Sequence, residues 1–291
     1  MDFRTDLALE AAENFPALSD TDCYHTRKTE GDITVTRLEI RSDNAAQTLG
    51  KPIGTYITLE LPPLTDDERT LGTAAKLISR EMLSFLPKEG GVLSVGLGNR
   101  AITPDALGPR TADMILATRH IQGEFAKSVG LSDLRSSAVL VPGVLGQTGT
   151  ESRELVQGVC GVVRPAAVIV VDALAARSIH RLGCTVQLSD TGISPGAGVG
   201  NHRQPLNRDT LGVPVIGIGV PTVVDAATVA FDCGLPEKEI EKITPKAAGL
   251  VVTPREIDLL IARAARLLAA GINRALQPDY DPLELISLAL G

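Results

Sequence analysis

The sequence predicts an α/β protein with a largely parallel, mixed sheet, helices on both faces of the sheet, and an N-terminal β-hairpin or edge strands. Apolar and polar residues alternate over 33–40 and 55–61, which is typical of strands with one buried face. Beyond residue 91, short apolar runs alternate with stretches of helical periodicity, the pattern of β-α-β units. No internal repeat or low-complexity linker interrupts this order, so one compact domain is expected.

Each element is predicted from a local pattern. Apolar residues recur at helical spacing over 70–86, until Pro87 ends the helix. A long helix over 254–276 is predicted from Thr253 as N-cap, Pro254 in the first turn and a single apolar stripe. Between these helices the sequence predicts strand 92–96, helix 109–121, strand 137–142, helix 152–163, strand 167–172, helix 173–182, strands 184–189 and 213–218, and helix 222–231.

Composition excludes several classes of function. The net charge of -7, the 3% aromatic content and the lack of Trp disfavour nucleic-acid binding. The N-terminus has no apolar core of a secretory signal, and no apolar run approaches the ~20 residues of a membrane span. The four cysteines are widely scattered, which indicates neither a metal pair nor a disulfide framework. We therefore expect a cytoplasmic protein.

Neither a metal nor a nucleotide cofactor is predicted. The four histidines lack the paired spacing of zinc proteases. Gly96, Gly98 and Ala101 have the spacing of a dinucleotide fingerprint, but Pro104 and a loop follow where the fingerprint requires a helix. These glycines could equally serve only to turn the backbone.

Two aspartates, Asp105 and Asp172, each follow a short apolar run. If their strands are parallel neighbours, the carboxyl ends open onto one crevice, where open α/β sheets bind ligands. A carboxyl pair suits the activation of water, because one acid stays ionised as general base while the other keeps its proton and polarises a carbonyl. Each aspartate alone could instead cap a helix, near Pro109 and before Ala173 respectively. The pair is therefore a candidate active site.

Other residues are candidates for substrate binding. Asp190 and Thr191 begin an Asp-Thr-Gly triplet like that of aspartic proteases, but those enzymes are all-β and use two such triplets, so this one is interpreted as a turn beside the crevice. Gly198, Gly200 and Asn201 lie in a long Gly-rich loop, which could approach an extended peptide or form an exposed lid. Asp225 follows Pro221-Thr222 and is interpreted as structural, in the first turn of a helix.

Nine motifs between residues 103 and 226 together carry a family resemblance. They are Thr103-Pro-Asp-Ala-Leu-Gly-Pro109, Thr118-Arg-His120, Pro142-Gly-Val144, Thr148-Gly-x-Glu151, Val171-Asp-Ala-Leu-Ala-Ala-Arg-Ser178, Ser189-Asp-Thr-Gly-Ile193, Gly198-Val-Gly-Asn201, Thr210-Leu-Gly-Val-Pro-Val215 and Gly219-Val-Pro-Thr-Val-Val-Asp-Ala226. The chain resembles the germination protease of endospore-forming bacteria from Thr5 to about Asn273.

The resemblance implies an atypical aspartic-type endopeptidase that degrades small acid-soluble spore proteins in the spore core during germination. It also implies a zymogen and a homotetramer, with the two catalytic aspartates at Asp105 and Asp172. The hydrogenase maturation endopeptidases have motifs similar to 96–108 and 171–173, and in that related family the acids recognise nickel. The fold is accordingly expected to be like that of the maturation proteases.

The N-terminal segment resembles the family's processing site and substrate site, an acidic residue followed by a large apolar residue and then Ala-x-Glu. By this match the cut falls between Asp6 and Leu7, which leaves a propeptide of residues 1–6 and a peptidase domain of residues 7–291. The chain departs from the family in this short propeptide and in lacking a longer insertion between Asp232 and Gly249. Two alternatives remain: a metal-recognising maturation endopeptidase and a non-catalytic α/β binding protein.

Overall fold

The structure is a computed structural model of the 291-residue chain. It describes residues 5–15, 18–66, 70–121, 133–196, 204–236, 238–240, 242 and 250–291. Three of the predicted substrate-binding residues, Gly198, Gly200 and Asn201, lie outside these ranges.

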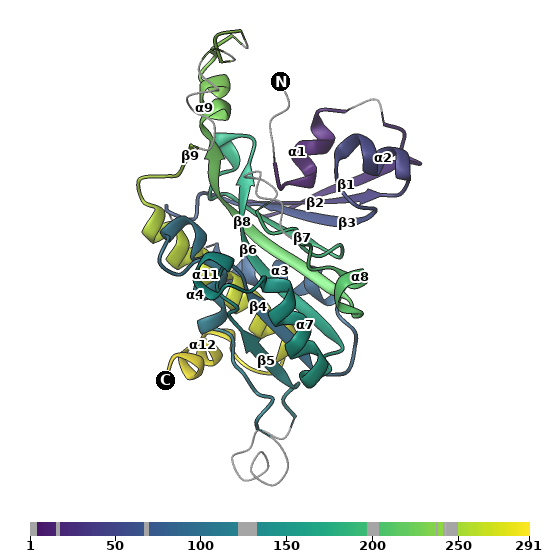
Figure 1. The fold of residues 1–291 in the computed structure, drawn as a ribbon, viewed down its shortest axis with the longest axis vertical. Helices are drawn as coiled ribbons and strands as arrows, with labels where there is room; N and C mark the ends of the chain where they lie inside the picture. The colour runs from purple at the N-terminus through teal and green to yellow at the C-terminus, as the bar shows by residue number, and fades with distance from the viewer. Residues whose placement is uncertain are drawn as a thin grey trace.

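The described residues form helices and strands that alternate along most of the chain (Figure 1). In chain order they are α1 (Ala8–Glu13), β1 (Cys23–Glu30), β2 (Ile33–Ile40), α2 (Asp43–Leu49), β3 (Gly54–Glu60), α3 (Leu71–Leu83), β4 (Val92–Gly96), the 3-10 helix η1 (Thr103–Asp105), α4 (Leu107–Asp113), β5 (Ser137–Leu140), α6 (Leu145–Thr148), α7 (Ser152–Val163), β6 (Ala167–Ala176), the 3-10 helix η2 (Ile179–Arg181), β7 (Thr185–Ser189), α8 (Arg208–Leu211), β8 (Val215–Asp225), α9 (Ala226–Asp232), β9 (Val251–Val252), α11 (Ile257–Leu276) and α12 (Pro282–Leu290).

The described strands form one mixed sheet in the order β1-β2-β3-β7-β8-β6-β4-β5, and β9 pairs with β8. The strands β8, β6, β4 and β5 run parallel to one another. The strands β1, β2, β3 and β7 are joined by antiparallel pairing, and β7 is also antiparallel to β8. The predicted class, a mixed α/β sheet with antiparallel N-terminal strands, is confirmed, although antiparallel pairings outnumber parallel ones among the described strands.

Both faces of the sheet are covered, but in different ways. On one face, α3 and α11 pack side by side and bury the main apolar core, which includes Ile169, Val171, Ile216 and Ile218 from the central strands. On the opposite face, α1 and α2 cover the antiparallel strands, and α7 packs on the strands at the other end. The central strands β7, β8 and β6 lie between these two groups of helices, and Gln187, Ser189, Gly217, Gly219 and Asp172 occur there on the opposite face from the main core.

The largest error of the sequence prediction concerns residues 173–182. A helix was predicted there, but β6 continues to Ala176 and is followed only by the short η2. The run Ala173-Leu-Ala-Ala176 has high helix propensity. However, Leu174–Ala176 pair with Pro221–Val224 of β8 and are buried, which is a strand environment. Tertiary context therefore overrides the local preference.

Smaller differences concern the ends of elements. The helix predicted over 109–121 is the shorter α4, and the helix predicted over 222–231 begins only at Ala226 because β8 extends to Asp225. Asp225 is the N-cap of α9, where its carboxylate accepts a hydrogen bond from the backbone N of Ala227 at 2.7 Å. This agrees with the structural role predicted for Asp225. The elements β1, α1, α2, η1, α6, α8, β9 and α12 were not predicted.

Candidate active site

Asp172 lies within β6 and not at the start of a helix, so the helix-cap alternative is wrong for this residue. It pairs with Gly219 of β8, which in turn pairs with Gln187 of β7. These three residues form a row across adjacent strands. Gly219 contributes no side chain to this row, and all three residues line one cavity. A Cβ atom at Gly219 would come within 2.7 Å of the Leu174 side chain, so even an alanine there would crowd this face.

Asp105 lies at the end of η1, after the loop that follows β4. Its carboxylate accepts a hydrogen bond from the backbone N of Asn99 at 2.7 Å, and it does not cap α4. Gly98 has a φ of +115°, and a Cβ atom there would lie 2.0 Å from the carbonyl oxygen of Asp105. The close approach of the Gly98 backbone therefore fixes the position of the aspartate.

The structure brings the two aspartates to one cavity. A cavity of about 330 Å³ is lined by Asp105 and Asp172 together with Asp6 of the N-terminal segment. A second cavity, of about 140 Å³, shares Asp6 and Asp172 and is also lined by Lys51 and Gln187. The crevice expected at the ends of the parallel strands is therefore present, and part of the N-terminal segment lies in it.

The backbone of the N-terminal segment is held against β6 and β7. The backbone N of Asp6 donates to the carbonyl oxygen of Ala175 at 2.9 Å, and the backbone N of Ala175 donates to the Asp6 carboxylate at 2.8 Å. The Gln187 amide bonds on both sides of Leu7: its Nε2 donates to the carbonyl oxygen of Asp6 at 3.0 Å, and its Oε1 accepts from the backbone N of Ala8 at 2.7 Å. Lys51 Nζ donates to the same Asp6 carbonyl oxygen at 3.1 Å.

The Leu7 side chain is fully buried in a small apolar cluster. Its neighbours in the cluster are Leu174 and Ala176 of β6 and Val224 of β8. Burial of a leucine side chain contributes on the order of 1.5–3 kcal/mol, so this contact alone anchors the segment firmly. The part of β6 beyond Asp172 thus forms the surface on which Asp6 and Leu7 lie, just before the helix α1 begins at Ala8.

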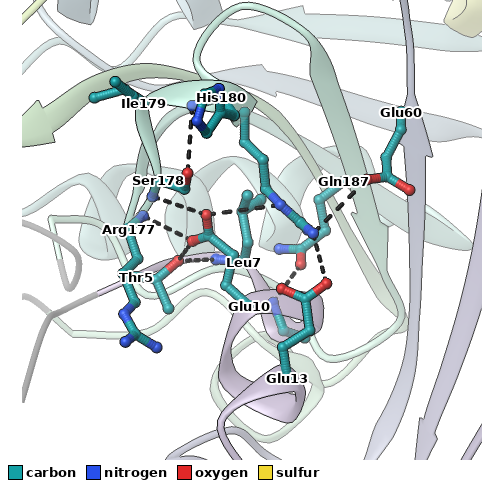
Figure 2. Close-up of polar contacts among 12 residues, drawn as sticks. Thr5, Leu7, Glu10, Glu13, Glu60, Arg177, Ser178, Ile179, His180 and Gln187 are labelled. Atoms are coloured by element: carbon teal, nitrogen blue, oxygen red, sulfur yellow. Dashed lines mark hydrogen bonds and ion pairs between the residues drawn. The ribbon is translucent and has the colours of Figure 1, made fainter. Parts of the chain in front are cut away.

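Glu10 is a charged residue with only 3% of its surface exposed. Figure 2 shows its carboxylate among Thr5, Arg177 and Ser178. Its carboxylate accepts hydrogen bonds from the backbone N of Arg177 at 2.7 Å, from the backbone N of Ser178 at 3.0 Å, and from the Thr5 hydroxyl. Arg181 lies 3.9 Å away. Burial raises the pKa of the Glu10 carboxyl above its usual range, and these hydrogen bonds lower it only in part.

The other predicted site residues lie at the edge of this arrangement. Thr191 lines the smaller cavity with Asp172. Asp190 is exposed, and its carboxylate accepts a hydrogen bond from the backbone N of Thr55 at 2.8 Å, which ties β7 to the start of β3. Within the part of the chain that the structure describes, no group of three or more His, Cys, Asp or Glu residues could hold a metal ion.

The sequence prediction missed the residues that hold the peptide, Lys51 and Gln187, as well as the partners of Glu10. One available signal was the polar alternation Thr185-x-Gln187-x-Ser189 in a strand that is otherwise buried, opposite Gly217-x-Gly219. Lys51 follows Gly50 in an ordinary turn sequence, and nothing local distinguishes it.

Comparison with known proteins identifies the family. The model of the germination protease family matches residues 7–234, well over half of the chain. The germination protease of Caldanaerobacter subterraneus subsp. tengcongensis is 42% identical, with 98% of this chain and 97% of that protein covered. The germination protease of Clostridium perfringens is 39% identical, with 95% of each chain covered. The germination protease of Priestia megaterium is 33% identical, with 96% and 94% covered, in an alignment of 351 positions.

That alignment is longer than the 291 residues of this chain, so the Priestia protein has segments that this chain lacks. Among solved structures, the [NiFe] hydrogenase maturation protease HycI from Thermococcus kodakarensis aligns with a TM-score of 0.38 and 19% identity, covering 72% of this chain and 98% of that one. The family match and the relatives show that this chain is a peptidase that belongs to the germination protease family.

Proposed function

We propose that this protein is a spore endopeptidase that cleaves small acid-soluble spore proteins during germination, with Asp105 and Asp172 activating the attacking water. One observation carries the proposal. The peptide bond between Asp6 and Leu7 lies against β6, and Asp6 lines the cavity to which both aspartates contribute. A segment of the chain itself therefore occupies the position that a substrate peptide would take.

The proposed reaction is direct hydrolysis. The oxygen of water forms a bond with the carbonyl carbon, and one proton of the water passes to the ionised aspartate. The carbon–nitrogen bond then breaks, and the leaving nitrogen takes a proton from the other, protonated aspartate. The products are a new carboxyl group and a new amine, and no covalent intermediate forms.

Self-processing between Asp6 and Leu7 is part of the proposal. The pattern that the resemblance implies consists of an acidic residue, a large apolar residue, and then Ala-x-Glu. In this chain the apolar position is the buried Leu7, and the final acidic position is Glu10 in its backbone pocket. The apolar and the final acidic side chain of the pattern, Leu7 and Glu10, are thus both in contact with the rest of the protein. The homotetramer and the location in the spore core stay predictions.

The test uses the purified full-length protein. After incubation at mildly acidic pH, mass spectrometry should show the loss of residues 1–6, and a peptide containing Thr-Glu-Phe-Ala-Ser-Glu should be cut between Glu and Phe. The variant Asp172→Asn should lose both activities while its circular dichroism and thermal unfolding stay like those of the wild type.

Three outcomes would contradict the proposal. Full activity in both Asp105→Asn and Asp172→Asn would remove the aspartates from the mechanism. Cleavage that requires a nickel-loaded partner protein would favour a maturation endopeptidase. If the protein neither loses residues 1–6 nor cuts the peptide, a non-catalytic α/β binding protein would be favoured.

A further inference from the structure

The carbonyl oxygen of Asp6 receives two hydrogen bonds from side chains on separate elements. Lys51 Nζ donates at 3.1 Å from the turn between α2 and β3, and Gln187 Nε2 donates at 3.0 Å from β7. Both donors line the smaller cavity together with Asp172. This oxygen belongs to the peptide bond between Asp6 and Leu7.

The two donors are held in place by further contacts. Gln187 is 8% exposed, and its Oε1 accepts from the backbone N of Ala8, so the direction of its Nε2 group is fixed. Lys51 Nζ also donates to the carbonyl oxygen of Thr5 at 2.9 Å. Burial lowers the pKa of the Lys51 ammonium, while Asp6 and Glu10 oppose this effect. An ammonium and an amide N–H group from separate elements are therefore directed at a single carbonyl oxygen.

Resting on the function proposed above, we propose that Lys51 and Gln187 are catalytic residues that bind the carbonyl oxygen of the cleaved bond and stabilise the oxyanion. When water attacks the carbonyl carbon, the electron pair of the carbon–oxygen double bond moves to this oxygen and gives it a negative charge. Oriented donors stabilise such a charge more strongly than they stabilise the neutral carbonyl.

This assignment changes the division of work at the site. In the mechanism expected from the sequence, the protonated aspartate polarises the carbonyl. With Lys51 and Gln187 at the oxygen, Asp105 and Asp172 are left with the two proton transfers: one accepts a proton from water, and the other donates a proton to the leaving nitrogen. The electron pair on the oxyanion returns to form the carbonyl of the product as the carbon–nitrogen bond breaks.

The test compares Gln187→Glu and Lys51→Met with the wild type on the peptide containing Thr-Glu-Phe-Ala-Ser-Glu. Gln187→Glu keeps an oxygen that can accept from the backbone N–H of the residue at the Ala8 position, removes the donor, and adds a negative charge beside the oxyanion. Lys51→Met keeps most of the side-chain length and removes the charge. Each variant should lower kcat by about 10²–10³-fold, the usual effect of removing one oxyanion donor, and should change KM by less than about threefold.

A second measurement does not depend on turnover. A phosphinic peptide, whose tetrahedral phosphorus group resembles the intermediate, should bind the wild type more tightly than the substrate peptide binds Asp172→Asn, as measured by calorimetry. Both donor variants should lose about 10²-fold or more of this affinity. Lys28→Met on β1 and Gln157→Glu on α7 are matched controls on exposed residues, and they should behave like the wild type.

Several results would overturn the inference. One is a pair of correctly folded donor variants that keep the wild-type kcat and the wild-type affinity for the phosphinic peptide. Another is a raised KM with unchanged kcat, because the two side chains would then only bind the substrate. If the wild type cuts no peptide, the proposed function fails and this inference fails with it. If the wild type cuts and Asp172→Asn does not, while the donor variants cut normally, only the present inference fails.

Discussion

The two aspartates come from the same kind of sequence pattern, yet the structure surrounds them differently. After β4 the chain leaves the sheet, and Asp105 lies at the end of a loop where the backbone of Asn99 holds its carboxylate. By contrast, β6 continues for four residues beyond Asp172, and its later residues contact the N-terminal segment.

This difference separates two tasks. The region from β4 to η1 supplies one carboxylate to the shared cavity. The region from Asp172 in β6 to Ser178, two residues past the end of the strand, supplies a carboxylate, a backbone pairing for Asp6, an apolar pocket for Leu7 and two backbone donors for Glu10. A strand that continues past its proposed catalytic residue offers further backbone and side-chain contacts to a bound segment, as β6 does here.

The largest expected effect tests what the two regions share. Asp105→Asn and Asp172→Asn should each lower kcat by about 10²–10⁴-fold, because each removes one partner of a proton-transfer pair. The double variant should lose little more than the worse single variant, because groups that act as one unit are not additive. Steady-state kinetics on the peptide measure these losses, and Asp43→Asn, on the exposed first turn of α2, is the control.

A double variant whose loss equals the product of the two single losses would show that the aspartates act independently. The comparison between the two regions would then describe two separate sites.

The next effect tests how Asp105 depends on its loop. Gly98→Ala should lower kcat by about 10²-fold, because the new Cβ atom would lie 2.0 Å from the carbonyl oxygen of Asp105 and would displace the aspartate. Gly31→Ala is the matched control. Gly31 also has a positive φ, of +61°, but a Cβ atom there meets nothing within 4 Å, so this variant should lose some stability and keep its activity.

Wild-type kcat in a folded Gly98→Ala protein would show that the position of Asp105 does not limit the reaction. The crystal structure of that variant would show whether the loop had moved.

The sequence predicted that the two aspartates share a crevice, but it did not predict the surface that holds the peptide, and the reason is physical. Asp105 and Asp172 follow apolar runs, and such local patterns are visible in a sequence. Gln187 and Lys51 reach the same peptide from β7 and from a turn about 135 positions earlier, and only the pairing of β3 with β7 and of β7 with β8 brings them together. The binding part of β6 was predicted as helix because its alanines and leucine favour a helix when they are considered alone.

A third prediction tests the apolar pocket of β6. Replacing Phe by Ala in the peptide, at the position equivalent to Leu7, should raise KM roughly 10–30-fold and leave kcat within a few fold, because about 1.5–2 kcal/mol of apolar burial is lost. Steady-state kinetics on the two peptides measure this effect. Replacing a Phe by Ala at a position that follows the second Glu of the peptide should change neither KM nor kcat. A fall in kcat at constant KM would mean that this pocket contributes to the transition state and not to holding the peptide.

The smallest effect concerns Glu10 and the pH. Burial raises the pKa of this carboxyl when the segment is docked, so the docked state binds a proton more readily than the free segment does. The resulting stabilisation of the docked segment is fully present below the usual pKa of about 4.5 and is lost as the pH rises through the raised value. Hydrogen exchange at the amides of residues 6–10 should therefore show more protection, after correction for the intrinsic rate, as the pH falls from 7 towards 4.5.

Two variants of α1 decide whether Glu10 causes this behaviour. Glu10→Gln cannot titrate, so its protection should no longer depend on pH over this range. Glu13→Gln removes an exposed carboxylate that pairs with Arg181 at 2.7 Å, and it should keep the wild-type dependence. If protection instead rises with pH in the wild type, the hydrogen bonds from Arg177 and Ser178 outweigh the cost of burying the charge. The pocket at the end of β6 would then favour the ionised glutamate, and mildly acidic conditions would release the segment from β6.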